Sequence, residues 1–498
     1  MTRWKKLFAV LLLLVGCLPL LRSDCHAQLA LGGSEQAQTI DVELPSTSTG
    51  SEAGTIVVRI QPPQSENSRY PEGAPVIVWL PGGTDTRGLD HGLPPEADDL
   101  VIVTFGFPGD PIGATPQESS GVYDYRGPKC ILALRDVILY AAGEKTDAQG
   151  RTIDDVMSLD VLHHNVGLMG VSNGGNIIVA VAAYHGQDLE GALQYIVQWE
   201  TPVSSQIATR DFGRVWLKPT PRQGDFVNPR YGGYDSPTLP SDYNDLAYDP
   251  GEPNYPVFHD GNGDGVYTTV TAAQGGFETP DLNGDGELGP DEDFPLDAYP
   301  GQTKNYYSRP VAQALAERDV LPEPWPEDIG TPTETTAYWD LRESVRLYEQ
   351  AIDNLPGLEA MVIGSSRDHV QSLPDKPHLR QAWEGWHDQG AWVRLNPDPA
   401  YILKVDPGLE EYEQNLPDNA PNTAPSDWSR SRTYAEPEIV PDEVYQLAAV
   451  WEMADRVQTR QTAEQGTDPT PRSGVSCWGT LGLFGLVLFV GFKKARGL

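Results

Sequence analysis

Cysteine is scarce in this chain. Only four of the 498 residues are Cys, and three of them (Cys17, Cys25 and Cys477) lie near the ends. Cys130 is therefore alone between Gln28 and Gly474, and no intramolecular disulfide can form there. Stability in this region has to come from the hydrophobic core or from bound metal.

Basic residues are also few. The chain has 35 Lys and Arg against 71 Asp and Glu, a formal net charge of −36. This excludes a nucleic-acid binder, which must neutralise phosphates with a basic surface. A disordered acidic chain is excluded too, because 39% of the residues are hydrophobic, including 12 Trp and 21 Tyr. The chain is long enough to bury one large core.

Residues 1–27 have the order of a secretory signal peptide. Basic residues precede the apolar run Leu7–Leu21, and small residues follow it. Leu14–Cys17 resembles a bacterial lipobox, in which the Cys is lipidated after cleavage, whereas Cys25–Ala27 offers an ordinary cleavage site. Both routes predict export to the periplasm or cell surface.

The other end of the chain is apolar. Val475–Phe492 contains no charged residue and is followed by two Lys and an Arg, so residues 475–498 are predicted to be a transmembrane or sorting tail. A buried C-terminal helix is the alternative. The polar residues 462–474 are expected to link this membrane anchor to the body.

The body alternates strand and helix patterns. Apolar runs without alternation predict strands buried on both faces, as in parallel sheets. Strands are expected at 39–44, 55–60, 75–80, 100–105, 166–170, 195–199, 358–364 and 391–395, and helices at 129–142, 176–184, 336–354, 378–387 and 442–458. The fold class is therefore α/β, with a mostly parallel, doubly wound sheet.

One long segment departs from this pattern. Between Tyr231 and Thr303 there are fifteen acidic residues and no Lys or Arg. Gly, Pro and Asp dominate residues 204–335, which predicts a long, acidic, loop-rich insertion between the two parts of the core, 28–203 and 336–461.

A serine motif lies at one strand-to-helix junction. Gly170-Val-Ser172-Asn-Gly174 matches Gly-x-Ser-x-Gly, caps the apolar run Val166–Met169 and opens a helix. This strand-turn-helix context exposes a Ser hydroxyl at the edge of a sheet and makes Ser172 a candidate nucleophile. The alternative is a glycine-rich turn in which Ser172 merely caps the helix.

On these residues the chain resembles the α/β-hydrolase fold family, from Thr39 to Gln458 apart from the insertion. Val76–Gly83 is similar to that family's strand and oxyanion loop, although Pro81 stands where His is common. The resemblance implies that backbone N–H groups near Gly83 and of Asn173 face the developing oxyanion.

The same resemblance extends to a late strand. Met361–Val370 is similar to the strand and loop that supply the family's acid, and Asp368 is the matching carboxylate. An exposed loop Asp beside Arg367 is the alternative.

The family's usual base is missing. A His is normal after the last strand, here near Asn396, but none of the nine His residues lies beyond His387. Without a base, a Ser hydroxyl is a poor nucleophile. If the strand before Glu200 lies between those of Ser172 and His369, these two residues start about 10 Å apart, and Glu200 would orient His369 as base. His378 or His387 is a second possibility, and no competent base is the third.

The insertion carries two loops with the spacing of calcium ligands. The second matches a twelve-residue EF-hand-type loop, with ligands expected at Asp281, Asn283, Asp285, Glu287 and Glu292. The first repeats half of it at Asp260, Asn262 and Asp264, but Thr271 replaces the closing Glu. Flanking prolines make the loops resemble dockerin or thrombospondin-type repeats. Bound Ca²⁺ would offset the repulsion among the carboxylates.

The sequence favours an exported, membrane-tethered serine hydrolase acting on a small-molecule or peptide substrate at an ester, or alternatively a peptide, bond. The rival interpretation is a catalytically decayed α/β-hydrolase scaffold that acts as a calcium-dependent surface binding protein. A His nitrogen within reach of Ser172 would favour the enzyme.

Overall fold

A computed structural model of the chain describes residues 39–63, 69–84, 88, 97, 99–110, 118–207, 211, 243–260, 263–267, 294–364, 368, 370, 376–409, 420–425, 428 and 440–466. The predicted signal peptide, the C-terminal tail, His369 and the calcium loop 281–292 lie outside these ranges. Within them, no helix is long and apolar enough to cross a membrane.

An eight-stranded sheet forms the centre of the molecule, in the order β1-β2-β4-β3-β5-β6-β12-β13. The pairs β1–β2 and β2–β4 are antiparallel and the other five are parallel. The strands are β1 (Ile40–Pro45), β2 (Thr55–Gln61), β3 (Ala74–Leu80), β4 (Val101–Phe105), β5 (Val161–Val171), β6 (Leu193–Trp199), β12 (Glu359–Ile363) and β13 (Val393–Leu395). This mostly parallel sheet is consistent with the predicted α/β-hydrolase class.

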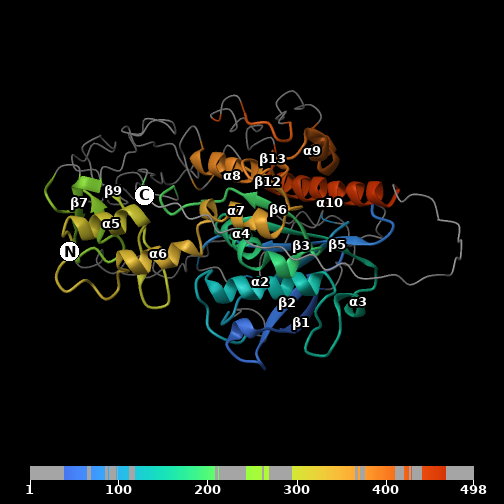
Figure 1. The fold of residues 1–498 in the computed structure, drawn as a ribbon, viewed down its shortest axis with the longest axis horizontal. Coiled ribbons are helices and arrows are strands. Elements are labelled where there is room, and N and C mark those ends of the chain that lie inside the picture. The colour runs from blue at the N-terminus through green and yellow to red at the C-terminus, as the bar shows by residue number, and fades with distance from the viewer. Residues whose placement is uncertain are drawn as a thin grey trace, which may run out of the picture.

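The sheet is buried on both faces. Every residue of β3 is buried; Val76 and Val78 belong to one apolar cluster and Ile77 to another, because successive side chains point to opposite faces. Helices α2 (Pro128–Ala141), α4 (Asn173–His185), α7 (Tyr348–Asn354) and α8 (Pro377–His387) contribute to the first cluster, and α9 (Pro399–Val405) and α10 (Asp442–Gly466) to the second. In Figure 1, α2 and α10 lie on opposite sides of the sheet. The short α3 (Ile153–Val156) precedes β5.

The prediction of one continuous helix over 336–354 is wrong. Helix α6 (Pro332–Asp340) ends early, a 3₁₀ turn follows at Ser344–Arg346, and α7 begins only at Tyr348. Glu343, between them, has an extended backbone and a buried carboxylate that binds Ser205 and Arg309. These tertiary contacts, invisible to helix propensity, break the helix.

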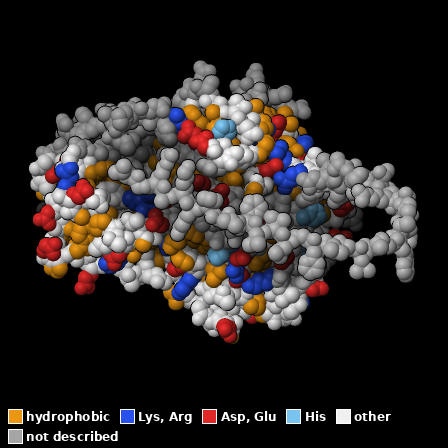
Figure 2. Space-filling view, in the orientation of Figure 1, with side chains coloured by type: hydrophobic (Ala, Val, Ile, Leu, Met, Phe, Trp, Pro, Cys, Tyr) orange, Lys and Arg blue, Asp and Glu red, His pale blue; other side chains and the backbone are white. Residues whose placement is uncertain are grey.

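The described part of the insertion is more regular than expected. It contains a three-stranded sheet of β7 (Leu246–Tyr248), β8 (Val257–His259) and β9 (Phe294–Pro295), a hairpin of β10 (Tyr299–Pro300) and β11 (Asn305–Tyr306), and helix α5 (Arg309–Glu317). Val257, Tyr307 and Val311 belong to an apolar cluster separate from the two at the main sheet. The insertion forms one end of the molecule (Figure 1), and acidic side chains are spread along its outer edge (Figure 2).

Candidate active site

Ser172 occupies the turn between β5 and α4. Its backbone has φ 50° and ψ −122°, a conformation that costs an L-residue about 1–3 kcal/mol and persists only where the surroundings enforce it. The Ser172 N–H donates to Trp199 O at 2.8 Å, and Ser172 O accepts from the Gly175 N–H at 2.9 Å. Strain at a half-buried serine on a strand-helix turn fits a nucleophile elbow.

The glycines of the motif are required by close packing. A Cβ at Gly170 would lie 2.4 Å from Gly174 O, and one at Gly174 would lie 2.6 Å from Pro81 O. Both distances are well below van der Waals contact, so no larger residue fits. The motif is therefore a steric requirement of this turn.

The predicted oxyanion loop lies directly beside Ser172. A Cβ at Gly82 would be 3.7 Å from Ser172 Oγ, and Gly83 has a φ of 70°. Asn173 is the first residue of α4, so its N–H has no acceptor within the helix. The Gly82–Gly83 loop and the first turn of α4 therefore both lie next to Ser172.

Arg126 holds the predicted oxyanion loop, and its role could not be predicted from the sequence. Its Nη2 donates to Pro81 O at 3.1 Å and to Gly82 O at 3.4 Å, and its guanidinium lies 4.5 Å from the centre of the Phe107 ring. In a trans peptide the C=O and the following N–H point in opposite directions. By fixing these two carbonyls, Arg126 fixes the directions of the Gly82 and Gly83 N–H groups.

The loop that carries Arg126 is itself strained and supported. Tyr125 and Arg126 have φ values of 53° and 64°. Arg342 donates from Nε to Tyr125 O at 2.8 Å and from Nη2 to Asp124 O at 2.7 Å. Burial raises the pKa of Tyr123, whose hydroxyl stays protonated and donates to Thr84 O. No sequence motif marks this support.

Three strand ends meet beside the serine. Strand β6 lies between β5 and β12, with Trp199 opposite both Val171 and Ile363. The strand before Glu200 therefore lies between the strands that precede Ser172 and His369, as the sequence analysis required. Glu200 is buried and donates its N–H to Ile363 O at 2.8 Å. Parallel strands end at the same edge, where α/β folds bind ligands.

Asp368 pairs with His378. Its Oδ2 lies 2.6 Å from His378 Nε2, and both side chains are fully buried. The other oxygen, Oδ1, accepts the Val370 N–H at 2.8 Å, so both neighbours of His369 in the chain are anchored. His378 Nδ1 is buried and has no hydrogen-bond partner among the described residues. His387 stacks on Trp383 with 4.4 Å between ring centres and hydrogen-bonds to Asp388.

The first predicted calcium loop is partly described. The Asp260 carboxylate accepts the N–H groups of Gly263, Asp264 and Gly265 at 2.7–3.1 Å, and both glycines have φ above 70°. Asn262 lies outside the described residues. Within the described ranges, no cluster of three or more His, Cys, Asp or Glu is arranged to hold a metal, and the calcium sites stay a prediction.

Similar proteins are found among solved structures. No protein-family model and no curated protein matches the chain. Solved structures that resemble it include esterase Est22, at 10% identity and TM-score 0.34 over 86% of this chain and 79% of that one. Carboxyl esterase 2 of the fungus Tuber melanosporum matches at 12% and 0.34, over 74% and 78%.

A thermostable carboxylesterase from a metagenomic library matches at 18% identity and TM-score 0.24, over 36% of this chain. The match spans about half of that esterase, 53% of its length.

Replacing Arg126 should slow chemistry at Ser172. In Arg126→Gln, the rate constant for phosphonylation of Ser172 by a fluorophosphonate is expected to fall about tenfold or more, because the oxyanion N–H groups lose their fixed direction. Labelling followed by mass spectrometry measures this rate. Arg346→Gln, an exposed arginine on the 3₁₀ turn, is the matched control; an equal rate in all three proteins would contradict the role of Arg126.

Proposed function

We propose that this protein is an exported serine hydrolase that cleaves carboxylic esters through Ser172. The observation that supports this most is the strained backbone of Ser172 at the end of β5, beside the Gly82–Gly83 loop. A serine that only capped the helix would not need a φ of 50°, whereas a serine exposed as a nucleophile on this tight turn does.

The chemistry follows from this arrangement. Ser172 Oγ attacks the ester carbonyl as a base removes its proton, and the carbonyl electrons move to the oxygen. The N–H groups of Gly83 and Asn173 stabilise this oxyanion, and Arg126 keeps the loop aligned. Collapse of the intermediate expels the alcohol, which regains the proton, and water then releases the acid from the acyl-enzyme.

The base we propose is His369, oriented by Glu200. Its neighbours Asp368 and Val370 are joined by a hydrogen bond, and Asp368 is held by the buried His378. In this scheme the Asp368–His378 pair positions the loop that carries the base. His378 itself is the other candidate, since its Nδ1 has no hydrogen-bond partner in the part of the chain that the structure describes.

The rival function is a surface binding protein on a decayed hydrolase scaffold. It is favoured by the lack of any His after His387. The two functions differ in whether Ser172 is activated.

An activated serine is directly testable. Protein comprising residues 28–474 should react with a fluorophosphonate and hydrolyse 4-nitrophenyl butyrate, and Ser172→Ala should abolish both, because the alanine has no nucleophile. Ser204→Ala is a matched control at another serine following a strand. Absence of labelling in the unmodified protein would favour the binding-protein alternative.

Two substitutions separate the candidate bases. His369→Gln should lower kcat for 4-nitrophenyl butyrate by about 100-fold or more, since it removes the proton acceptor. His378→Gln keeps a hydrogen-bonding side chain beside Asp368 and should lower kcat much less. A pH–rate profile of each protein gives the pKa of the group that remains; the reverse ranking would assign His378 as base.

We also propose that Ca²⁺ rigidifies the insertion and that the terminal segments export and tether the enzyme. Carboxylates at Asp281, Asp285 and Glu292 supply the hard oxygen ligands that Ca²⁺ requires. In the half-loop, Asp260 already organises the turn through three backbone N–H groups.

Calcium removal should destabilise the protein. A ligand at 100 times its Kd stabilises the folded state by about 2.7 kcal/mol, so chelation with EGTA is expected to lower Tm by several degrees in calorimetry. Glu292→Gln should lose most of this difference. Glu278→Gln, outside the loop, should keep it, and identical Tm values with and without calcium would refute the proposal.

A further inference from the structure

Helix α6 is fixed to the insertion at its C-terminal end. The Tyr338 hydroxyl donates to Pro300 O at 2.9 Å, and Trp339 Nε1 donates to Tyr307 O at 2.7 Å. The rings of Tyr306 and Tyr338 stack with 4.1 Å between their centres. The end of α6 therefore keeps the position that the folded insertion gives it.

Arg342, two residues after α6, reaches from this point to the loop that carries Arg126. Its guanidinium lies 3.8 Å from the centre of the Tyr338 ring, and its Nη1 donates to Tyr338 O at 2.9 Å. Its Nε and Nη2 donate to the carbonyl oxygens of Tyr125 and Asp124 at 2.8 and 2.7 Å. A planar guanidinium holds several acceptors in one fixed geometry. One side chain thus joins the insertion to this loop.

A glycine makes room for the guanidinium. Gly127 precedes α2 with a φ of −84°, a value that any residue can adopt. A Cβ at Gly127 would lie 2.4 Å from Arg342 Nη2 and 2.9 Å from Asp124 O. Close packing against Arg342, and not the backbone conformation, therefore explains why a glycine is needed here.

The insertion contacts the same loop a second time. Gln302, between β10 and β11, donates from Nε2 to Tyr123 O at 3.2 Å. The Tyr123 hydroxyl in turn donates to Thr84 O, directly after the Gly82–Gly83 loop. The insertion thus holds the loop at Tyr123 as well as through Arg342.

This support acts on a strained turn. Tyr125 and Arg126 have left-handed φ values of 53° and 64°, which persist only where neighbouring groups enforce them. Arg342 binds the carbonyl groups of the two peptide bonds that precede Arg126. Without these hydrogen bonds the turn can relax, and Arg126 would no longer fix the directions of the Pro81 and Gly82 carbonyl groups.

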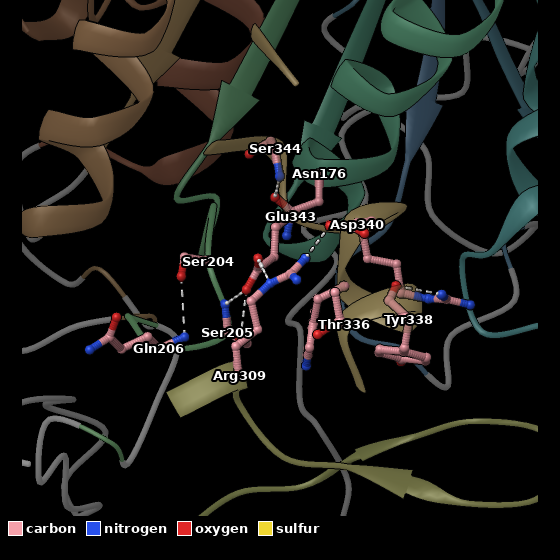
Figure 3. A network of polar contacts seen from close by, with 12 residues as sticks. Asn176, Ser204, Ser205, Gln206, Arg309, Thr336, Tyr338, Asp340, Glu343 and Ser344 are labelled. Atoms are coloured by element: carbon pink, nitrogen blue, oxygen red, sulfur yellow. Dashed lines mark hydrogen bonds and ion pairs between the residues drawn. The ribbon is translucent and has the colours of Figure 1, made fainter. Parts of the chain in front are cut away.

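The chain after Arg342 also reaches the first turn of α4. The Ser344 N–H donates to Asn176 Oδ1 at 3.3 Å, and Asn176 Nδ2 donates to Asn173 Oδ1 at 3.3 Å. Glu343, shown with them in Figure 3, is buried and anchors this segment to α5 through an ion pair. The segment therefore contacts both the loop described above and the helix that follows the serine turn.

We propose that Arg342 is a positioning residue for the hydrolysis at Ser172, through which the folded insertion sets the Gly82–Gly83 loop and the rate of serine acylation. This inference rests on the proposed hydrolysis and adds a regulation of that site. Arg342 acts through Arg126 and not on the ester itself. A change that loosens the insertion then slows the reaction at Ser172 in addition to lowering stability.

The kinetics of fluorophosphonate labelling test this role. Arg342→Gln should lower the maximal rate constant for phosphonylation of Ser172 about fivefold and leave the dissociation constant of the fluorophosphonate unchanged, because alignment affects the bond-forming step. Arg342→Lys keeps the cation on the Tyr338 ring and should lose less. Arg346→Gln, the exposed arginine control, should match the unmodified protein.

A double-mutant cycle separates action through Arg126 from a general loss of structure. Adding Arg342→Gln to Arg126→Gln should slow labelling by less than about twofold, because residues that act through one another are not additive. A further loss of about fivefold would instead show that the two arginines act independently. That result, or an Arg342→Gln rate equal to that of the unmodified protein, would overturn the inference.

Amide hydrogen exchange gives a readout that needs no turnover. Measured by mass spectrometry, Arg342→Gln should raise exchange about threefold or more in peptides covering 78–84 and 123–127, since both segments lose support. Strand β1 and the Arg346→Gln protein should exchange as before. Unchanged exchange in 123–127 would refute the role of Arg342 whether or not Ser172 reacts. Faster exchange with no labelling of Ser172 in any protein would refute the hydrolase and keep Arg342 as the link between the insertion and the loop.

Discussion

The backbone at Ser172 adopts a conformation that L-residues avoid, and its surroundings hold it there. Gly170 and Gly175 allow the strand, the turn and helix α4 to approach within distances that a side chain would block. Beneath them Gln198, fully buried, donates to Gly175 O at 3.2 Å and accepts from Trp386 Nε1 at 2.7 Å. Because a buried polar group is costly when unpaired, this hydrogen-bonded set resists relaxation of the turn. The position of Ser172 is thus a property of the packed core beneath it.

The insertion is joined to the core by a small polar network. Glu343 accepts from Ser205, just after β6, and from Arg309 at the start of α5, while the Ser344 N–H donates to Asn176 of α4 (Figure 3). Arg342, one residue earlier, holds the loop that supports Arg126. The 3₁₀ segment between α6 and α7 therefore connects the insertion, helix α4 and the Gly82–Gly83 loop.

Much of the sheet could be predicted from the sequence, because its strands are short apolar runs buried on both faces; the eight expected strands fall within a few residues of the observed ones, although β5 begins five residues earlier. The serine turn was predictable because its glycines are a steric need. Arg126 was not, since it is 44 residues from Gly82 and acts through carbonyl contacts that only the fold creates. Helix α5 was missed within a segment dominated by Gly, Pro and Asp. Tertiary contacts of Glu343 also overrode the local helix propensity. The roles of His369 and the calcium ligands stay predictions.

The insertion leaves the sheet after β6 and the chain returns at β12, the next strand of the sheet. Entry and exit are therefore neighbours, and the sheet keeps its hydrogen bonding whatever length of chain is placed between them. Such an arrangement separates two kinds of evolutionary change. Residues of the insertion are free to vary without disturbing the sheet, while the glycines and Gln198 beneath the serine stay constrained by packing.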